Sequence, residues 1–219
     1  MPYILLTNDD GITAPGLRTL HDLLSPKAEV VVVAPDRQRS ATSHALTLSE
    51  PLRARKVKEN GQLFGYAVSG TPVDCVKLAH HDLLDRLPDL VISGINYGSN
   101  TGINALYSGT LAAAVEGTIL GIPSIAVSLT TFRNANFEPA ARFTLKLIPH
   151  LLERGLPKGI TLNINVPNVP TEELQGVRVT IQGNSIYDDH YDARKDPMGQ
   201  SYYWLTGTKI NDHLSLIHI

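Results

Sequence analysis

The sequence lacks several residue types and patterns, and each absence excludes a class of protein. Its 219 residues include one cysteine, Cys75, so no disulfide can form within the chain and a zinc site built on cysteines is not expected. No apolar run reaches the roughly 18 residues that a membrane-spanning helix needs. The first residues, Met1-Pro2-Tyr3, lack the basic and apolar regions of a signal peptide, so we expect a cytosolic protein.

Charge of one sign is not concentrated anywhere in the chain. The net charge at pH 7 is −2, and neither a basic stripe nor a block of like charges is present. This composition argues against a nucleic-acid groove and against a charged tail. A small anionic ligand remains compatible with it, because a bound metal can supply positive charge locally.

The patterns that are present alternate between strand and helix. Apolar, β-branched segments predict strands, and apolar residues spaced three and four apart predict helices. The predicted strands are 3–7, 29–34, 89–93, 122–129 and 160–166, and the predicted helices are 16–24, 70–84, 109–120 and 139–152. The alternation predicts an α/β fold with a doubly wound, mostly parallel sheet.

Two segments depart from the alternation. Residues 46–70 contain two β patterns around Asn60-Gly61, a strong hairpin signal, and predict a β-hairpin excursion from the core. The sequence over 177–207 predicts a strand, a long polar loop and a second strand. We therefore expect an α/β core over residues 1–170 and an extended arm over 171–219.

Polar loops follow three of the predicted strands, and the carboxyl ends of parallel strands share one edge of the sheet. The first loop carries Asp9 and Asp10, the second carries Ser40 and the third carries Asn96. Carboxylate, hydroxyl and amide oxygens suit Mg²⁺, Mn²⁺ or Ca²⁺ better than zinc or copper. A divalent cation would also offset the repulsion between the two adjacent carboxylates.

Each of these residues also has an ordinary structural explanation. Asp-Asp-Gly is common in turns, Ser40 taken alone fits a loop hydroxyl, and Asn96 taken alone fits a left-handed turn. The metal hypothesis depends on the three loops meeting at one edge. A predicted helix begins at Ser108, Gly109 and Thr110, and this start fits a phosphate site or an ordinary serine N-cap equally well.

Taken together, these stretches resemble the stationary-phase survival protein SurE family of metal-dependent nucleotidases. The matching sequences are ILLTNDDGITAPGLRTL, VVVVAPDRQRSATSHALTL, VSGTPVDCV, PDLVISGINYGSNTGINALYSGTLAAAVEG, GIPSIAVSL and LNINVP, in the family's order. They extend from residue 3 to about residue 205. The resemblance implies a Rossmann-like core with an extended hairpin and a C-terminal arm that build a homodimer or homotetramer.

The resemblance also implies an activity and a set of site residues. The activity is divalent-metal-dependent hydrolysis of nucleoside 5′-monophosphates, often of 3′-monophosphates, and in some members of polyphosphate. The family's metal site, with one Mg²⁺, Mn²⁺ or Ca²⁺ ion, carries over to Asp9, Asp10, Ser40 and Asn96. We expect Asp9, Asp10 and Asn96 to act in catalysis. The candidates for substrate and phosphate binding are Asn8, Ser108, Gly109 and Thr110.

Three alternatives fit the sequence less well. A haloacid-dehalogenase-type phosphatase, which passes through an aspartyl-phosphate, uses Asp-x-Asp where this chain has Asn8-Asp9-Asp10. A non-catalytic receiver domain needs a phosphoacceptor aspartate after the third strand, where this chain reads Ser93-Gly94-Ile95-Asn96. A dinucleotide-binding domain would carry G-x-G-x-x-G after the first strand, and the motif is absent there.

The end of the chain departs from the family. After SYYWLTG the family continues with an acidic loop, a further strand and a closing helix, whereas this chain reads TKINDHLSLIHI. The last six residues, 214–219, resemble the translation of a sequencing adapter. We therefore expect a truncated C-terminus with a foreign tail over 214–219, which places the family's oligomer in question for this chain.

Overall fold

The computed structural model describes residues 1–183 and 186–210. The foreign tail predicted at 214–219 lies outside these residues. The chain divides into two compact units. The first contains residues 1–100 and 104–176, and the second contains 101–103 and the described residues from 177 onward.

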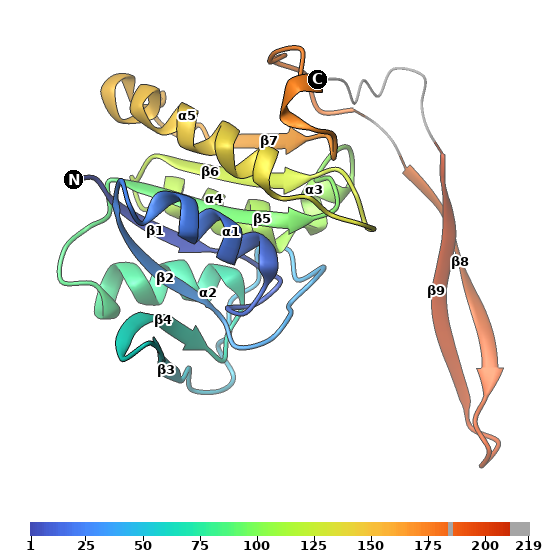
Figure 1. Ribbon diagram of the computed structural model, residues 1–219. Helices are drawn as coiled ribbons and strands as arrows, with labels where there is room; N and C mark the ends of the chain where they lie inside the picture. Colours follow the sequence, from blue (N-terminus) through green and yellow to red (C-terminus); the bar gives the residue numbers. More distant parts are fainter. Residues whose placement is uncertain (184–185, 211–219) are drawn as a thin grey trace. The chain divides into compact units, whose positions relative to one another are not determined.

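The first unit is built on a seven-stranded sheet, which Figure 1 shows between two layers of helices. The strand order is β3-β4-β2-β1-β5-β6-β7, and all neighbours pair in parallel except β3 and β4. The strands are β1 (Tyr3–Thr7), β2 (Glu29–Pro35), β3 (Ala54–Glu59), β4 (Gln62–Val68), β5 (Leu90–Tyr97), β6 (Ser124–Leu129) and β7 (Leu162–Val166). The predicted α/β fold with a mostly parallel, doubly wound sheet is confirmed.

Helices cover both faces of this sheet and bury a separate apolar cluster on each. One cluster packs α1 (Pro15–Leu24) and α5 (Glu138–Arg154) on the sheet, and the other packs α2 (Pro72–Leu78) and α4 (Gly109–Ile119). The apolar spacing that predicted α1 is the buried side of that helix, since Leu17, Leu20 and Leu24 are fully buried. The remaining helical turns are α3 (Asn104–Tyr107), η1 (Ala79–Leu83) and η2 (Thr171–Glu173).

The topology determines where a ligand can bind. From β1 the chain passes through α1 to β2 on one side, and from β5 it passes through α4 to β6 on the other. The connections therefore diverge from the neighbouring strands β1 and β5. In such sheets, a crevice opens beyond the carboxyl ends of the two strands at this switch point.

The predicted hairpin excursion needs correction. β3 and β4 do form a hairpin around Asn60-Gly61, but β4 also pairs in parallel with β2, so the hairpin extends the main sheet. Burial of Phe64, Ala67 and Val68 accounts for this, because β4 packs apolar side chains into the core. The first strand begins at Ala54, and the preceding residues 46–53 are a loop.

The second unit contains an antiparallel hairpin of β8 (Ile186–Lys195) and β9 (Ser201–Ile210). The prediction of a strand near residue 177 and a long polar loop after it is wrong. Residues 177–183 are irregular, and the polar stretch forms β8. Both faces of this two-stranded ribbon are exposed, so apolar and polar residues do not have to alternate along β8. The sequence of β8 therefore lacks the alternation that predicts a strand.

Within the described part of the chain, no helix combines the length and apolar character needed to cross a membrane.

Candidate metal centre

A tight turn directly after β1 presents the two adjacent carboxylates. The Asn8 side chain closes this turn: its Nδ2 donates to Gly11 O at 3.0 Å, and Gly11 N donates to Asn8 Oδ1 at 3.1 Å. Asn8 is fully buried. The turn therefore holds Asp9 and Asp10 beyond the carboxyl end of β1, in the expected crevice.

Asp9 lies against the N-terminus of α4. It is 5% exposed, and its Oδ1 accepts a hydrogen bond of 2.5 Å from Thr110 Oγ1. Gly109 permits this close approach, since a Cβ at that position would lie 2.9 Å from Asp9 Cβ. Burial raises the pKa of Asp9, while hydrogen bonds from Thr110 and from the first backbone N–H groups of α4 oppose the rise.

Asp10 is less buried, and its neighbours stabilise its charged form poorly. Its Oδ2 accepts one long hydrogen bond, 3.4 Å, from Tyr97 N. Burial and the adjacent charge of Asp9 together raise the pKa of Asp10 to about 6. Among the described residues, no ion pair involves either aspartate. Two neighbouring, desolvated carboxylates without a positive partner are the electrostatic signature of a cation site.

A bulge in β5 places Asn96 beside this pair. The register of β5 with β6 shifts between Ser93 and Asn96, and bulges of this kind redirect side chains at sites. Gly94 makes the bulge possible, because its φ is 142° and a Cβ there would lie 2.3 Å from Val127 O. Asn96 Nδ2 donates to Gly98 O at 2.8 Å, so Oδ1 is the amide atom left to bind a cation.

Ser40 and Asp10 line the same cleft of about 520 Å³. Ser40 is exposed, and its Oγ accepts a hydrogen bond of 2.8 Å from Gln38 Nε2. The cleft is also lined by Thr13, Ala14, Pro15, Gly16, Gln38, Tyr97, Phe132 and Phe137. Sequence reasoning missed the three aromatic residues among these. Phe132 left a usable signal, because it is a large apolar residue in the polar loop TTFRNANFEP.

The predicted phosphate-binding residues are brought together only in part. Ser108 Oγ accepts from Leu111 N at 3.0 Å and so caps α4, while Thr110 Oγ1 donates to Asp9. Gly109 and Thr110 thus contact Asp9, while Ser108 caps the helix beside them. The amide of Asn8 faces Gly11 instead, which favours a role in shaping the turn over direct contact with phosphate.

The donor chemistry fits one hard divalent cation. Asp9 and Asp10 would supply charged oxygens, and Asn96 and Ser40 would supply neutral ones. Within the described residues, no group of three or more His, Cys, Asp or Glu side chains gathers as a metal cluster. A site of two carboxylates completed by neutral oxygens is therefore what the chain offers to a hard divalent cation.

Comparison with known proteins agrees with this fold. Residues 4–189 match the family model described as "Survival protein SurE". The 5′-nucleotidase SurE of Chlorobium phaeobacteroides is 51% identical over 99% of this chain and 84% of its own length. The 5′-nucleotidase SurE of a Cyanothece strain is 52% identical over 95% of this chain and 78% of its own.

A solved structure gives the same result in three dimensions. The crystal structure of the SurE protein from Aquifex aeolicus superposes with a TM-score of 0.82 at 41% identity, covering 98% of this chain and 87% of that one. The resemblance noted in the sequence is thereby confirmed over almost the whole chain. With its sheet, its switch-point carboxylates and these relatives in agreement, the chain belongs to the SurE family.

Proposed function

We propose that this chain is a metal-dependent phosphomonoesterase that hydrolyses nucleoside 5′-monophosphates. The observation that carries the proposal is the pair Asp9 and Asp10, which lie at the switch point of the sheet without an ion-pair partner among the described residues. Relatives about half identical over most of their length are named 5′-nucleotidases. The comparisons give no support to the haloacid-dehalogenase or receiver alternatives.

The four oxygen donors would hold one Mg²⁺, Mn²⁺ or Ca²⁺ ion. Such an ion, when bound, polarises the phosphoryl group and makes water a better nucleophile. Asp9 is almost fully buried and fixed by Thr110, which suits a ligand that must not move. Asp10 lines the open cleft, so it is the carboxylate that can orient an attacking water or accept its proton. Asn96 would supply a neutral oxygen to the ion from the neighbouring strand β5.

The start of α4 would stabilise the phosphate. Helix N-termini favour anions through their free N–H groups and dipole, and Ser108, Gly109 and Thr110 occupy this position in α4. Asp9 contacts the same turn, so the helix start lies beside a residue that would hold the cation. The helix start and the cation would both stabilise the negative charge that develops during transfer.

The aromatic part of the cleft would bind the nucleoside. Tyr97 and Phe137 pack edge to face with ring centres 5.5 Å apart, and Phe132 is 76% exposed beside them. An exposed aromatic face can stack on any base, because every base has a π surface. We therefore expect limited base preference. The family resemblance adds 3′-monophosphates and polyphosphate as further expected substrates.

Phosphate release tests the proposal. Purified protein would be incubated at neutral pH with a panel of 5′- and 3′-nucleoside monophosphates and a short polyphosphate, with Mg²⁺, with Mn²⁺ and with EDTA. Metal-dependent release that EDTA abolishes is the expected result. A folded protein that binds Mn²⁺ but releases no phosphate from any substrate would refute the proposal.

The hairpin would serve assembly. It exposes large apolar side chains, and exposed apolar surface of this kind marks interaction sites. They are Tyr191, Tyr202, Tyr203, Trp204 and Leu205. We expect a homodimer or homotetramer built through this hairpin. Light scattering after size exclusion measures the mass directly, and a monomer at micromolar concentration would contradict the expectation.

A further inference from the structure

The loop that carries Ser40 has neither regular secondary structure nor extensive apolar burial to define its conformation. Residues 36–53 join β2 to β3 without helix or strand. Apolar burial is limited: Leu46 and Leu48 are 44% and 89% exposed, and of the loop's leucines Leu52 alone packs against a core cluster. Ala41 and Ser43 adopt φ values of 55° and 53°, which residues with a Cβ rarely do. Such a conformation persists only where surrounding contacts impose it.

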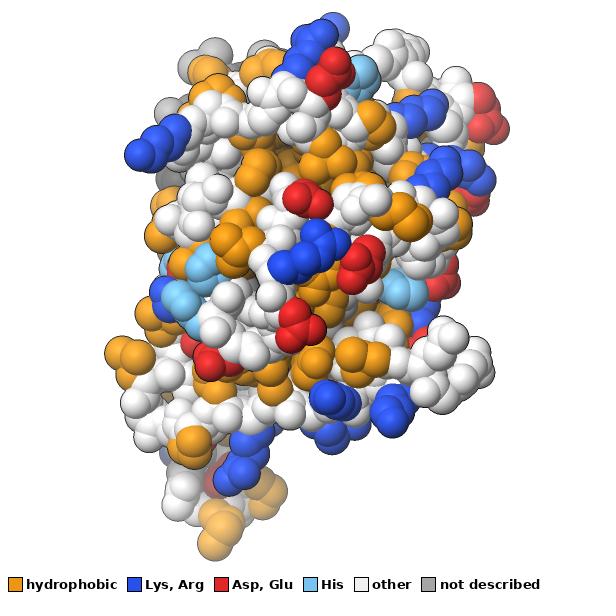
Figure 2. Space-filling view, turned by 90° about the vertical axis from the view of Figure 1, so that its left-hand side faces the viewer, with side chains coloured by type: hydrophobic (Ala, Val, Ile, Leu, Met, Phe, Trp, Pro, Cys, Tyr) orange, Lys and Arg blue, Asp and Glu red, His pale blue; other side chains and the backbone are white. Residues whose placement is uncertain are grey.

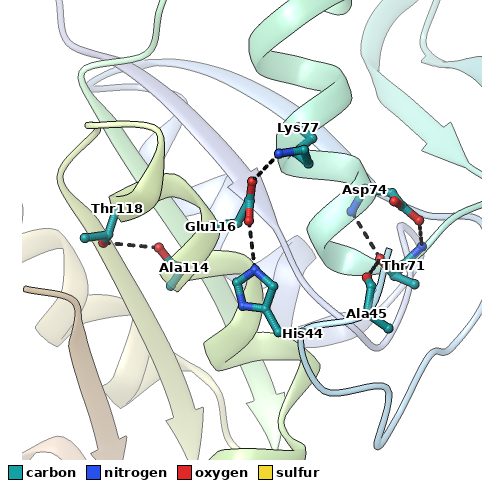
Figure 3. A network of polar contacts seen from close by, with 8 residues as sticks. All are labelled: His44, Ala45, Thr71, Asp74, Lys77, Ala114, Glu116 and Thr118. Carbon is teal, nitrogen blue, oxygen red and sulfur yellow. Dashed lines mark hydrogen bonds and ion pairs between the residues drawn. The ribbon is translucent and has the colours of Figure 1, made fainter. Parts of the chain in front are cut away.

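A buried carboxylate on α4 supplies the first of these contacts. The Glu116 side chain is 4% exposed and lies in the last turn of the helix, where the helix dipole disfavours an anion. Lys77 Nζ donates to Oε1 at 2.9 Å, and His44 Nε2 donates to Oε2 at 2.8 Å (Figure 3). Burial raises the pKa of Glu116, but these two donors outweigh it and leave the pKa below its usual value.

The two donors to Glu116 come from different parts of the fold. Lys77 belongs to α2, so its bond joins two helices that already pack together. His44 belongs to the loop, so its bond joins the loop to α4. Ser43, the preceding residue, adds two bonds at the same place: its Oγ donates to Leu106 O at 2.7 Å and its N donates to Tyr107 O at 3.1 Å.

The N-terminus of α2 holds the other side of the loop. Thr71 Oγ1 donates to Ala45 O at 2.7 Å, as Figure 3 shows, and Thr47 Oγ1 donates to Asp74 Oδ2 at 2.6 Å. Asp74 is 3% exposed and also forms the capping box of α2 with Thr71. The segment 43–47 is therefore bonded to three helices within a few residues.

The other end of the loop lies on the metal centre. Arg39 N donates to Asp9 O at 2.7 Å. A Cβ on Gly109 would lie 3.1 Å from Thr42 Oγ1 and 3.1 Å from Asp9 Oδ2, so Thr42 and Asp9 pack on the same point of α4. One helix thus fixes both parts of the centre: its first turn holds Asp9, and its last turn holds the loop through His44.

We propose that Glu116 is a positioning residue for the metal centre, which acts through His44 to hold the loop so that Ser40 faces the cation site beside Asp10. The inference rests on the proposed function for the identity of Ser40 as a ligand. Weakening the Glu116–His44 bond would loosen the loop between its remaining bonds, so Ser40 would be held less firmly at the site and metal affinity would fall. Because the Lys77 bond joins only helices, its loss would lower stability and leave metal affinity unchanged.

The test compares four variants with wild type. His44→Ala removes the loop donor, His44→Gln restores a donor of similar reach, Glu116→Gln removes the charge, and Lys77→Met is the matched control on the same carboxylate. For each protein, Mn²⁺ affinity is measured by calorimetry without substrate. Hydrogen exchange is followed in a peptide covering residues 36–48, and the thermal midpoint is recorded in EDTA.

The expected result is a contrast between the two donors. In His44→Ala and Glu116→Gln, Mn²⁺ affinity falls by up to about 10-fold and the loop exchanges faster. Direct outer partners of metal ligands cost 10–100-fold, and these two residues act one step further away, through the loop. His44→Gln recovers most of the affinity, and Lys77→Met keeps it. His44→Ala with wild-type affinity and wild-type loop exchange overturns the inference, as does an equal loss of affinity in Lys77→Met.

The readouts also separate this inference from the proposed function. A wild-type protein that binds no Mn²⁺ refutes the function, whereas loop exchange in His44→Ala still shows whether Glu116 holds the loop. If Glu116→Gln does not fold, the two His44 variants alone decide the question, because they leave the buried carboxylate and its Lys77 bond in place.

Discussion

The two edges of the parallel sheet treat acidic side chains in opposite ways. At the edge where the strands begin, two acids have partners within the protein: Asp89 Oδ2 accepts from Tyr3 N at 2.7 Å, and Glu29 pairs with Arg86 at 2.7 Å. Figure 2 shows that edge, where acidic, basic and apolar side chains are interspersed. At the opposite edge, Asp9 and Asp10 are more buried and, within the described residues, form no ion pair.

The difference separates acids that serve the fold from acids that serve a ligand. Acids partnered within the protein leave little charge for a ligand, and exposed pairs of this kind add little stability. Two adjacent, desolvated carboxylates destabilise the metal-free protein, and a cation bound between them would offset that cost. Substitution of Asp9 or Asp10 should therefore lower activity and stabilise the metal-free protein, whereas substitution at the other edge should leave activity unchanged.

The largest contrast is expected between Asp10→Asn and Asp89→Asn. The first removes a charged ligand and should lower phosphate release from a nucleoside monophosphate by more than about 100-fold, since even outer partners of metal ligands cost 10–100-fold. Asp9→Asn should behave in the same way. Asp89→Asn keeps an oxygen that accepts from Tyr3 N and should turn over normally. Equal losses at both edges would contradict the comparison.

The next contrast concerns pH. In the folded, metal-free protein the pKa of Asp10 is about 6 and that of Asp9 is also raised, so between the unfolded and folded pKa values the folded state binds more protons. The free energy of unfolding should therefore fall as pH rises from about 4 to about 6, because the folded protein loses its extra protons over this range. The raised pKa of Asp10 accounts for a loss on the order of 3 kcal/mol. Denaturant unfolding in EDTA measures this.

The matched variant isolates the group responsible. Asp10→Asn cannot ionise at this position, so the difference in unfolding free energy between variant and wild type should grow with pH over that range, in favour of the variant. Adding Mn²⁺ should reverse the order, because the wild type binds the ion more tightly and so gains more binding energy than the variant. A difference that does not change with pH would show that Asp10 has an ordinary pKa.

A smaller effect is expected in the aromatic part of the cleft. Phe132→Ala removes an exposed stacking surface worth about 1–3 kcal/mol per base, so KM for a nucleoside 5′-monophosphate should rise about 10-fold. KM for glycerol phosphate, which has no base, should stay unchanged. A parallel rise for both substrates would assign Phe132 to the phosphate end of the cleft.

The smallest effect is expected for the exposed ion pair at the edge where the strands begin. Arg86→Met removes its ion pair with Glu29, in which both side chains are at least half exposed, and should change the unfolding free energy by at most about 1 kcal/mol. Phosphate release should not change. A loss of activity in this variant would mean that the two edges are coupled.

The sequence predicted the parts of the molecule that depend on burial. The bounds of β1 and α4 were predicted almost to the residue. A short apolar run followed by a turn, and a long run of small residues after a serine, each indicate one type of element. The polar residues at this edge followed from the topology. Asp9 and Asp10 follow β1 as predicted, whereas Asn96 lies within β5, which extends to Tyr97, and not in a loop after residue 93. Their roles as ligands stay a prediction, as does the cytosolic location.

Features that depend on tertiary contacts could not be predicted. β8 is polar because the ribbon is exposed on both faces, so no periodic pattern identified it. The bulge at Gly94 and the parallel pairing of β4 with β2 depend on neighbouring strands that are distant in sequence. Glu116 and His44 are far apart in the chain, and neither carries a motif that indicates their contact.

The most direct test of the central claim is calorimetric titration of Mn²⁺ into metal-free wild type and Asp10→Asn at neutral pH. We predict one bound ion per chain in the wild type, with affinity that weakens as pH falls below about 6 because protons compete for Asp10. Asp10→Asn should bind at least 10-fold more weakly while remaining folded. Equal Mn²⁺ binding by the two proteins would show that the paired carboxylates are not the metal centre.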